Sequence, residues 1–142
     1  MTSSRNHSTY DTHYHIVFPV KYRKALLRGE LPQAIVEIAR ALQERYDIEF
    51  EKIGCDVNHI HILCSFKPSY SGSDVVRIFK SITAKELFKQ FPQLRKELWG
   101  GELWSDGYYL ATVSERGNWA AVERYVASQG KTKEDHQLRL FN

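Results

Sequence analysis

Two histidines alternate with bulky apolar residues in the middle of the chain, in the stretch His59-Ile60-His61-Ile62. This period of two is typical of a β-strand, whose successive side chains point to opposite faces. Both imidazoles should therefore leave the same face, one strand step apart. Each neutral imidazole offers one nitrogen lone pair, so the pair suits a divalent cation. Most His-x-His pairs are ordinary surface or core histidines, so a metal site here also needs a third ligand.

A second informative spacing lies near the C-terminal end, in a helix predicted between Asn118, a good N-cap, and Gly130, a good stop signal. Tyr125 and Gln129 are four residues apart, so they share one face of this helix. If the helix crosses the histidine strand, Gln129 adds a carbonyl oxygen and Tyr125 a phenol. Two nitrogens and one oxygen would suit Mg²⁺ or Mn²⁺. Such helical pairs are usually plain surface pairs, and other histidines offer rival ligand sets: His7, His13, His15 and His136.

A cation beside a tyrosine would suit chemistry on a phosphodiester. The cation polarises a non-bridging oxygen and stabilises charge on the leaving oxygen. The ordinary tyrosine pKa is about 10, so the phenol is a poor nucleophile at neutral pH unless a nearby cation favours the phenolate. Attack by tyrosine yields a phosphotyrosine ester and a free hydroxyl, and because the bond energy is kept, rejoining needs no ATP. This favours cutting and rejoining strands over simple hydrolysis.

Composition predicts one globular domain over residues 1–142. The hydrophobic content of 42% and charged content of 26% are ordinary for such a domain. No apolar run is long enough to span a bilayer, and the polar start lacks a signal-peptide core, so we expect a cytoplasmic protein without membrane contact. Cys55 and Cys64 are expected to be reduced core residues. The net charge of +3 permits nucleic acid as a partner without demanding it.

Hydrophobic periodicity predicts alternating strands and helices along the chain. Strands are expected over residues 10–20, 48–55, 59–66 and 103–113, the last of them interrupted by Asp106-Gly107. Gly29 and Pro32 precede a first helix that runs to about Tyr46, and further helices are expected over 74–91 and 118–130, with a short helix or turn over 94–99. The second strand loses its alternation between Phe50 and Ile53, beside Gly54, which indicates a β-bulge. The ends, about residues 1–9 and 131–142, are expected to be flexible, although three apolar residues of the tail could dock: Leu138, Leu140 and Phe141.

The histidine stretch resembles the HUH signature (His, bulky hydrophobic, His) of nucleases that cut single strands. The chain as a whole resembles the small single-tyrosine transposases called TnpA, from minimal bacterial and archaeal insertion sequences. The matching segments keep that family's order and cover roughly residues 12 to 130: Tyr14-His15-Ile16-Val17-Phe18 with Lys21-Tyr22-Arg23, Val57 to Leu63, Phe79-Lys80-Ser81 with Ala84 to Phe88, Leu103-Trp104-Ser105 with Ala111-Thr112-Val113, and Tyr125 to Gln129.

The resemblance implies an α+β fold, a ferredoxin-like two-layer sandwich whose antiparallel sheet carries helices on one face, plus a C-terminal helix that bears the tyrosine. It implies that Tyr125 becomes joined to the 5′ phosphate of cleaved DNA, and that His59, His61 and Gln129 hold Mg²⁺ or Mn²⁺. Asn58 departs from the family, which often has Asp there, so we expect modest effects on turn geometry or histidine orientation. A homodimer with sites shared between subunits is also implied.

The partner implied by the resemblance is single-stranded DNA with imperfect hairpins at the element ends. Exposed tyrosines could stack on unpaired bases. Four basic residues could hold phosphates, although each is as readily a solvated surface residue: Lys21, Arg23, Lys80 and Lys85. Two alternatives remain open, a domesticated relative that acts on repeated palindromes and a non-catalytic domain that only binds nucleic acid.

Overall fold

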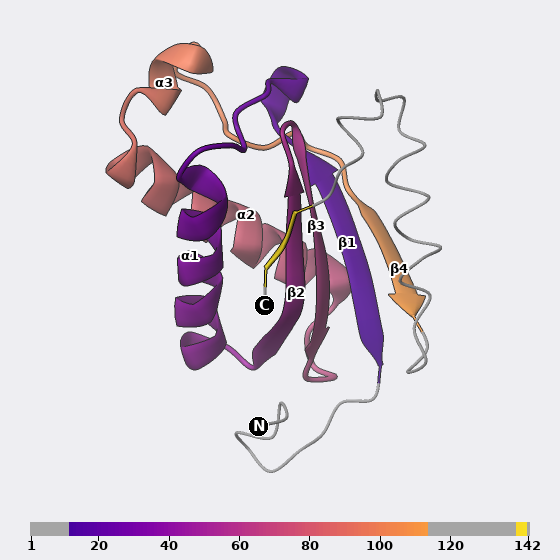
Figure 1. Cartoon of the computed structure of the whole chain (residues 1–142). Coiled ribbons are helices and arrows are strands. Elements are labelled where there is room, and N and C mark those ends of the chain that lie inside the picture. Colours follow the sequence, from indigo (N-terminus) through magenta and orange to yellow (C-terminus); the bar gives the residue numbers. More distant parts are fainter. Residues whose placement is uncertain (1–11, 114–138, 142) are drawn as a thin grey trace.

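The computed structural model describes residues 12–113 and 139–141 (Figure 1). In chain order the elements are β1 (His13–Pro19), the 3₁₀ turn η1 (Lys21–Arg23), α1 (Leu31–Arg45), β2 (Ile48–Asp56), β3 (His59–Phe66), α2 (Gly72–Gln90), α3 (Leu94–Glu97), β4 (Tyr109–Val113) and β5 (Arg139–Phe141).

The strands form one antiparallel sheet in the order β4-β1-β3-β2-β5. Helix α1 follows β1 and α2 follows β3, so the first four strands have the βαββαβ connectivity of a ferredoxin-like sandwich. Both long helices lie on the same side of the sheet (Figure 1). The predicted α+β sandwich is confirmed. The tyrosine-bearing helix predicted over residues 118–130 lies outside the described residues.

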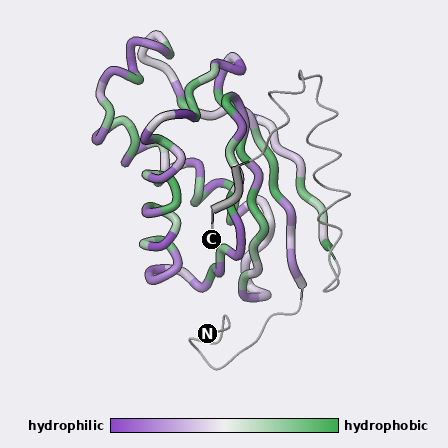
Figure 2. Tube along the Cα trace, viewed as in Figure 1, coloured by the Kyte–Doolittle hydropathy of each residue, from purple (hydrophilic) through white to green (hydrophobic). Residues whose placement is uncertain are grey.

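Alternate residues of the two central strands face the helices. Ile16 and Phe18 of β1, together with Ile60 and Ile62 of β3, are at most 1% exposed and belong to the main core cluster. Phe18 meets the ring of Phe79 on α2 edge-on, with centroids 5.9 Å apart. Figure 2 shows hydrophobic residues concentrated along the strands and interleaved with polar ones on α1. Because strand side chains alternate, the odd-numbered residues of β1 and β3 project from the opposite face.

Helix α2 begins with a capping box. The Ser71 hydroxyl accepts from the Asp74 backbone N–H at 3.0 Å, and the Asp74 carboxylate accepts from the Ser71 N–H at 2.9 Å. These two bonds satisfy donors that the first helical turn leaves unpaired. The helix ends at Gln90, two residues before Pro92, which cannot continue it. The cap therefore starts the helix two residues earlier than the periodicity predicted.

The predicted β-bulge in β2 is confirmed, because its pairing with β3 shifts register between Phe50 and Lys52. Glu51 is thus the extra residue. The strand predicted over residues 103–113 was too long. Only Tyr109–Val113 forms β4. Trp104 forms an isolated β-bridge with Val20, the residue that follows β1.

Three apolar residues of the tail were expected to be able to dock, and two of them, Leu140 and Phe141, lie in a strand. Arg139–Phe141 form β5, which pairs with β2 opposite Ile53, Gly54 and Cys55. Strand β5 therefore adds a fifth strand to the sheet, next to β2. In the part of the chain that the structure describes, no helix has the length and apolar character needed to cross a bilayer.

Candidate metal centre and nucleic-acid interface

The two histidines of the HUH stretch lie at the start of β3, directly after a tight turn. Strand β2 ends at Asp56, whose carboxylate accepts from the Val57 N–H at 2.9 Å, and β3 begins at His59. His59 and His61 project from the sheet face opposite α1 and α2, yet they are only 2% and 0% exposed. The predicted hairpin and the predicted shared face are therefore both present.

A hydrogen bond that His59 donates to the preceding residue, Asn58, orients its ring. The Nδ1 atom of His59 lies 2.9 Å from the Oδ1 atom of Asn58, and both side chains are buried. An amide oxygen only accepts, so the bond fixes the tautomer with the proton on Nδ1 and the lone pair on Nε2. A metal-binding histidine commonly donates its second N–H to such an oxygen. The departure at Asn58 therefore bears on histidine orientation, one of the two effects that the sequence led us to expect.

His61 lies over a residue that has no side chain. Gly54 of β2 pairs directly with His61 of β3. A Cβ atom added to Gly54 would lie 2.8 Å from Cδ2 and 2.9 Å from Cε1 of His61, and closer still to Nε2. Such distances are well below ordinary contact. The imidazole therefore occupies space that only glycine leaves open, whereas the sequence had associated Gly54 with the bulge.

A third imidazole stands beside His61. His15 of β1 is fully buried, and its ring is nearly parallel to that of His61, with centroids 6.4 Å apart. Burial lowers the pKa of His15 to about 4. Burial, with smaller contributions from His15 and His59, lowers the pKa of His61 to about 3. Both rings are therefore neutral at physiological pH, which is the state in which imidazole binds a metal.

The two histidines of β1, His13 and His15, lie in different environments. His13 does not join the cluster, because its Nδ1 atom lies 2.8 and 2.7 Å from the two carboxylate oxygens of Glu51. Burial raises the pKa of Glu51, and the hydrogen bond from His13 opposes that rise. Glu51 is the bulge residue, so alternation along the sequence could not reveal this pair. His7 and His136 lie outside the described residues.

The described residues include side chains whose chemistry fits a divalent cation. Buried, neutral imidazoles on one face, one of them oriented by an amide and one lying over a glycine, fit a divalent cation. Within residues 12–113 and 139–141, no three His, Cys, Asp or Glu side chains are grouped to hold a metal. The predicted third ligand, Gln129, and the predicted nucleophile, Tyr125, lie outside those residues.

One of the predicted DNA-contacting residues, Arg23, lines a cavity that His59 also lines. Arg23 and His59 line the same cavity of about 290 Å³, together with Tyr108 and Tyr109. Arg23 ends the η1 turn with a left-handed backbone, at a φ of 53°. A guanidinium at this position can hold a phosphate close to the histidine pair. Sequence spacing gave no reason to place Arg23 there, since thirty-odd residues separate it from His59.

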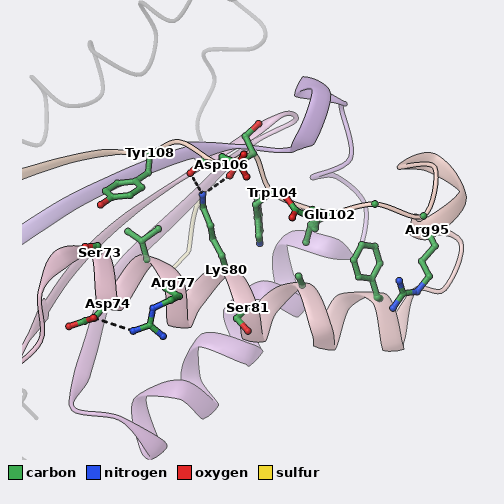
Figure 3. Close-up of a pocket in the computed structure, with 17 residues that line it drawn as sticks. Ser73, Asp74, Arg77, Lys80, Ser81, Arg95, Glu102, Trp104, Asp106 and Tyr108 are labelled. Carbon is green, nitrogen blue, oxygen red and sulfur yellow. Dashed lines mark hydrogen bonds and ion pairs between the residues drawn. The ribbon is translucent and has the colours of Figure 1, made fainter.

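The other basic residues are placed differently. A larger cavity, of about 880 Å³, lies between α2 and residues 100–108 (Figure 3). Within it, the Lys80 ammonium donates to the backbone carbonyls of Ser105, Asp106 and Gly107. Burial lowers the pKa of Lys80, against opposing contributions from Asp106 and Glu102. Lys80 thus holds the loop that leads into β4, whereas Lys85 is exposed on α2.

Comparison with known proteins places this chain in a family. The family described as "Transposase IS200 like" matches residues 8–129. The chain is 34% identical over 120 residues to the ISDra2 transposase TnpA of Deinococcus radiodurans, covering 84% of this chain and 85% of that protein. It is 32% identical over 123 residues to the transposase of insertion sequence IS200 from Salmonella typhimurium, covering 87% and 80%.

Solved structures share the fold. A crystal structure from Deinococcus radiodurans, assigned as a transposase, superposes with a TM-score of 0.72 at 27% identity and covers 93% of this chain and all of that one. A REP-associated tyrosine transposase bound to a REP hairpin gives a TM-score of 0.54 at 11% identity, covering 89% of this chain and 68% of that one, and is similar in fold alone.

The family match, carried on an antiparallel ferredoxin-like sheet, defines the class, which is that of DNA-cleaving and DNA-rejoining enzymes. The chain belongs to the IS200-like transposase family.

Proposed function

We propose that this transposase cleaves and rejoins single-stranded DNA at the ends of an insertion sequence, through a 5′-phosphotyrosine intermediate on Tyr125. His59, His61 and Gln129 would hold a divalent cation, Mg²⁺ or Mn²⁺. The observation that carries the proposal is the histidine pair itself. Two buried side chains share one face, and one of them is oriented by Asn58 in the tautomer that a metal ligand requires.

The chemistry is a transesterification. The phenol oxygen of Tyr125 attacks the phosphorus, a new bond forms between them, and the bond to the 3′ oxygen breaks. The phenol proton leaves, and the released 3′ oxygen takes up a proton to become a hydroxyl. A bound cation polarises the phosphate oxygens and lowers the pKa of the phenol. Rejoining is the reverse attack by a 3′ hydroxyl, so no ATP is consumed.

The residues around the histidines support a polyanionic substrate. Arg23 lines the cavity that His59 lines, so it holds a phosphate next to the reacting one. Lys21, in the same turn, adds a second cation. Lys80 is less suited to a phosphate contact, because three carbonyls already accept from its ammonium. The REP-associated transposase of the same fold binds a DNA hairpin, which supports hairpin-bearing single strands as the substrate.

The decisive experiment uses labelled, hairpin-bearing single-stranded DNA with Mg²⁺. The wild-type protein should form a protein–DNA adduct that survives denaturant, and EDTA should abolish it. Tyr125→Phe should form none, whereas Tyr46→Phe, a matched change at the end of α1, should behave as wild type. An adduct that persists in Tyr125→Phe assigns the nucleophile to another residue.

The same assay separates the alternatives. A protein that only binds nucleic acid forms no adduct and binds DNA equally with and without EDTA. A domesticated relative keeps the adduct, but its preferred DNA is a dispersed palindrome rather than the ends of its own element.

We also propose a homodimer whose active sites are shared between subunits. Mixing Tyr125→Phe with His59→Ala/His61→Ala, each inactive alone, should then restore part of the activity after subunit exchange. Absence of any recovery in verified mixed dimers places the whole site within one chain.

A further inference from the structure

Two aromatic side chains from distant parts of the sequence meet on the surface. Tyr22 belongs to the η1 turn and Trp99 follows α3, and their rings contact edge-on with centroids 5.1 Å apart. Tyr22 is 57% exposed and Trp99 is 72% exposed. Among the described residues only four large hydrophobic side chains are classed as exposed, so two of the four are in contact with each other. An exposed aromatic pair of this kind marks an interaction site.

The backbone holds both rings outward. Tyr22 and Trp99 have φ values of 61° and 53°, in the left-handed region that bulky residues rarely adopt. Turn hydrogen bonds fix these conformations, from the Arg23 N–H to the Val20 carbonyl at 2.8 Å and from the Trp99 N–H to the Lys96 carbonyl at 3.2 Å. The exposed positions of the two rings are therefore set by the fold rather than by loose side-chain rotation.

Cations surround the aromatic pair. The Lys24 ammonium lies 4.7 Å from the centroid of the Trp99 ring, and the Lys21 ammonium lies 5.7 Å from that of Tyr22. Residues 21–24 and 94–102 together carry five basic and two acidic residues, an excess equal to the net charge of the whole chain. The acidic partners are Glu102, 3.7 Å from Lys21, and Glu97, 3.8 Å from Lys24. Both glutamates are exposed, so these pairs are weak enough for a phosphate to displace them.

The aromatic pair adjoins the candidate active site through a single residue. Arg23 follows Tyr22 directly, and Arg23 lines the cavity that contains His59. A DNA strand with one phosphate at the histidine pair and the next at Arg23 therefore continues toward Tyr22 and Trp99. An unpaired strand has a base for each phosphate, and flat bases are what an aromatic surface with flanking cations accommodates.

We infer that Tyr22 and Trp99 form a stacking platform for an unpaired base of the DNA strand, next to the nucleotide at the histidine site. Lys21 and Lys24 hold the phosphates on either side of that base. The platform recognises a base by its flat face, so it favours single strands over duplex and is tolerant of sequence. This inference rests on the proposed single-stranded substrate, which it refines by naming residues that neither the HUH stretch nor the tyrosine helix includes.

The test compares two probes that share a phosphate backbone, fluorescein-labelled oligo(dT) and an abasic oligonucleotide of equal length. Binding is measured in EDTA, so that no cleavage occurs. Wild type should bind oligo(dT) about 5- to 150-fold more tightly than the abasic strand, the range expected for stacking on aromatic side chains. Tyr22→Ala/Trp99→Ala should lose most of that ratio, while its affinity for the abasic strand and its salt dependence stay unchanged.

Two controls separate stacking from folding. Tyr22→Phe/Trp99→Phe keeps both rings and should retain the preference for bases. Tyr70 also has a lysine over its ring, Lys67 at 4.9 Å, but it follows the end of β3 that is opposite to His59. Tyr70→Ala should therefore leave the ratio of the two affinities unchanged. Should the double alanine variant not fold, the emission of Trp99 gives a second measure. Oligo(dT) should quench wild type more than Trp99→Phe, because the difference between the two proteins isolates the emission of Trp99 from that of the other two tryptophans, Trp104 and Trp119.

A folded double alanine variant that keeps the wild-type ratio overturns the platform. So does equal quenching of wild type and Trp99→Phe. Failure of the platform leaves the proposed function intact whenever wild type still forms the tyrosine adduct. The reverse outcome is also distinguishable. If wild type forms no adduct but the double alanine variant loses the preference for bases, the platform is supported and the catalytic proposal is refuted.

Discussion

Gly54→Ala should move the His61 imidazole without removing or adding any polar group. The new methyl carbon would lie 2.8 and 2.9 Å from Cδ2 and Cε1 of the ring. Non-bonded carbons are most favourable at about 3.5 to 4.0 Å, so the ring has to shift by about 1 Å. It cannot swing outward freely, because His61 is fully buried and stands beside the ring of His15. The substitution should therefore displace a predicted metal ligand.

Two quantities should respond. Overpacking should lower the free energy of unfolding by about 1 to 3 kcal/mol. Displacement of the ligand should weaken Mn²⁺ binding about 10- to 100-fold, the effect usually seen when the support of a ligating histidine is altered. Urea unfolding measures the first quantity and calorimetric titration with Mn²⁺ measures the second. Gly107→Ala is the matched control, because a Cβ there meets nothing within 4 Å.

A double-mutant cycle makes the reasoning refutable. In the His61→Ala background the obstructing ring is gone, so Gly54→Ala should become neutral or stabilise the strand by about 0.5 to 1 kcal/mol, as alanine generally does relative to glycine. The sign of the stability change should thus invert between the two backgrounds. Equal destabilisation in both backgrounds, or wild-type Mn²⁺ affinity in Gly54→Ala, would refute the packing of His61 on Gly54.

Three further outcomes are expected. Asn58→Ala should lower Mn²⁺ affinity about 10- to 100-fold by removing the acceptor for His59, whereas Asn58→Asp should retain it, as read by calorimetry. Lys80→Met should lower the melting temperature measured by circular dichroism, because the carbonyls of the loop before β4 lose their shared donor. The free energy of unfolding of the metal-free protein should fall as the pH drops below 6.5. In that range His15 and His61 bind protons in the unfolded chain but stay neutral in the folded one, where their pKa values are about 4 and about 3.

Each outcome has a contrary result. Equal Mn²⁺ affinity in Asn58→Ala and Asn58→Asp would show that the hydrogen bond does not orient His59. An unchanged melting temperature in Lys80→Met, with weaker DNA binding instead, would return Lys80 to the phosphate-contacting role. The pH effect should steepen toward about 1.4 kcal/mol per pH unit for each of the two histidines. A urea midpoint that is flat between pH 7 and 5 would contradict their burial in the neutral form.

The local pattern was sufficient for most of the fold. Alternation of apolar residues predicted the positions of the strands β1, β2 and β3. Apolar residues at intervals of three and four predicted α1 and α2 to within a few residues. It was also sufficient for the shared face of His59 and His61. The strand predicted over residues 103–113 starts only after its expected interruption at Asp106-Gly107, and before that point Trp104 forms an isolated bridge. The pattern allowed apolar residues of the tail to dock, but it did not predict the strand β5. Tyr125 and Gln129 stay predictions, because they lie outside the described residues.

The sequence by itself determined which residues alternate, because the period of a strand is a property of the backbone and needs no distant partner. Only the tertiary structure decided which residues meet across strands and turns. Strand register places Gly54 against His61, the bulge brings Glu51 to His13, and the η1 turn puts Arg23 on the cavity that His59 lines. These contacts join residues that are far apart in the chain, and pairing between strands rather than local propensity sets them.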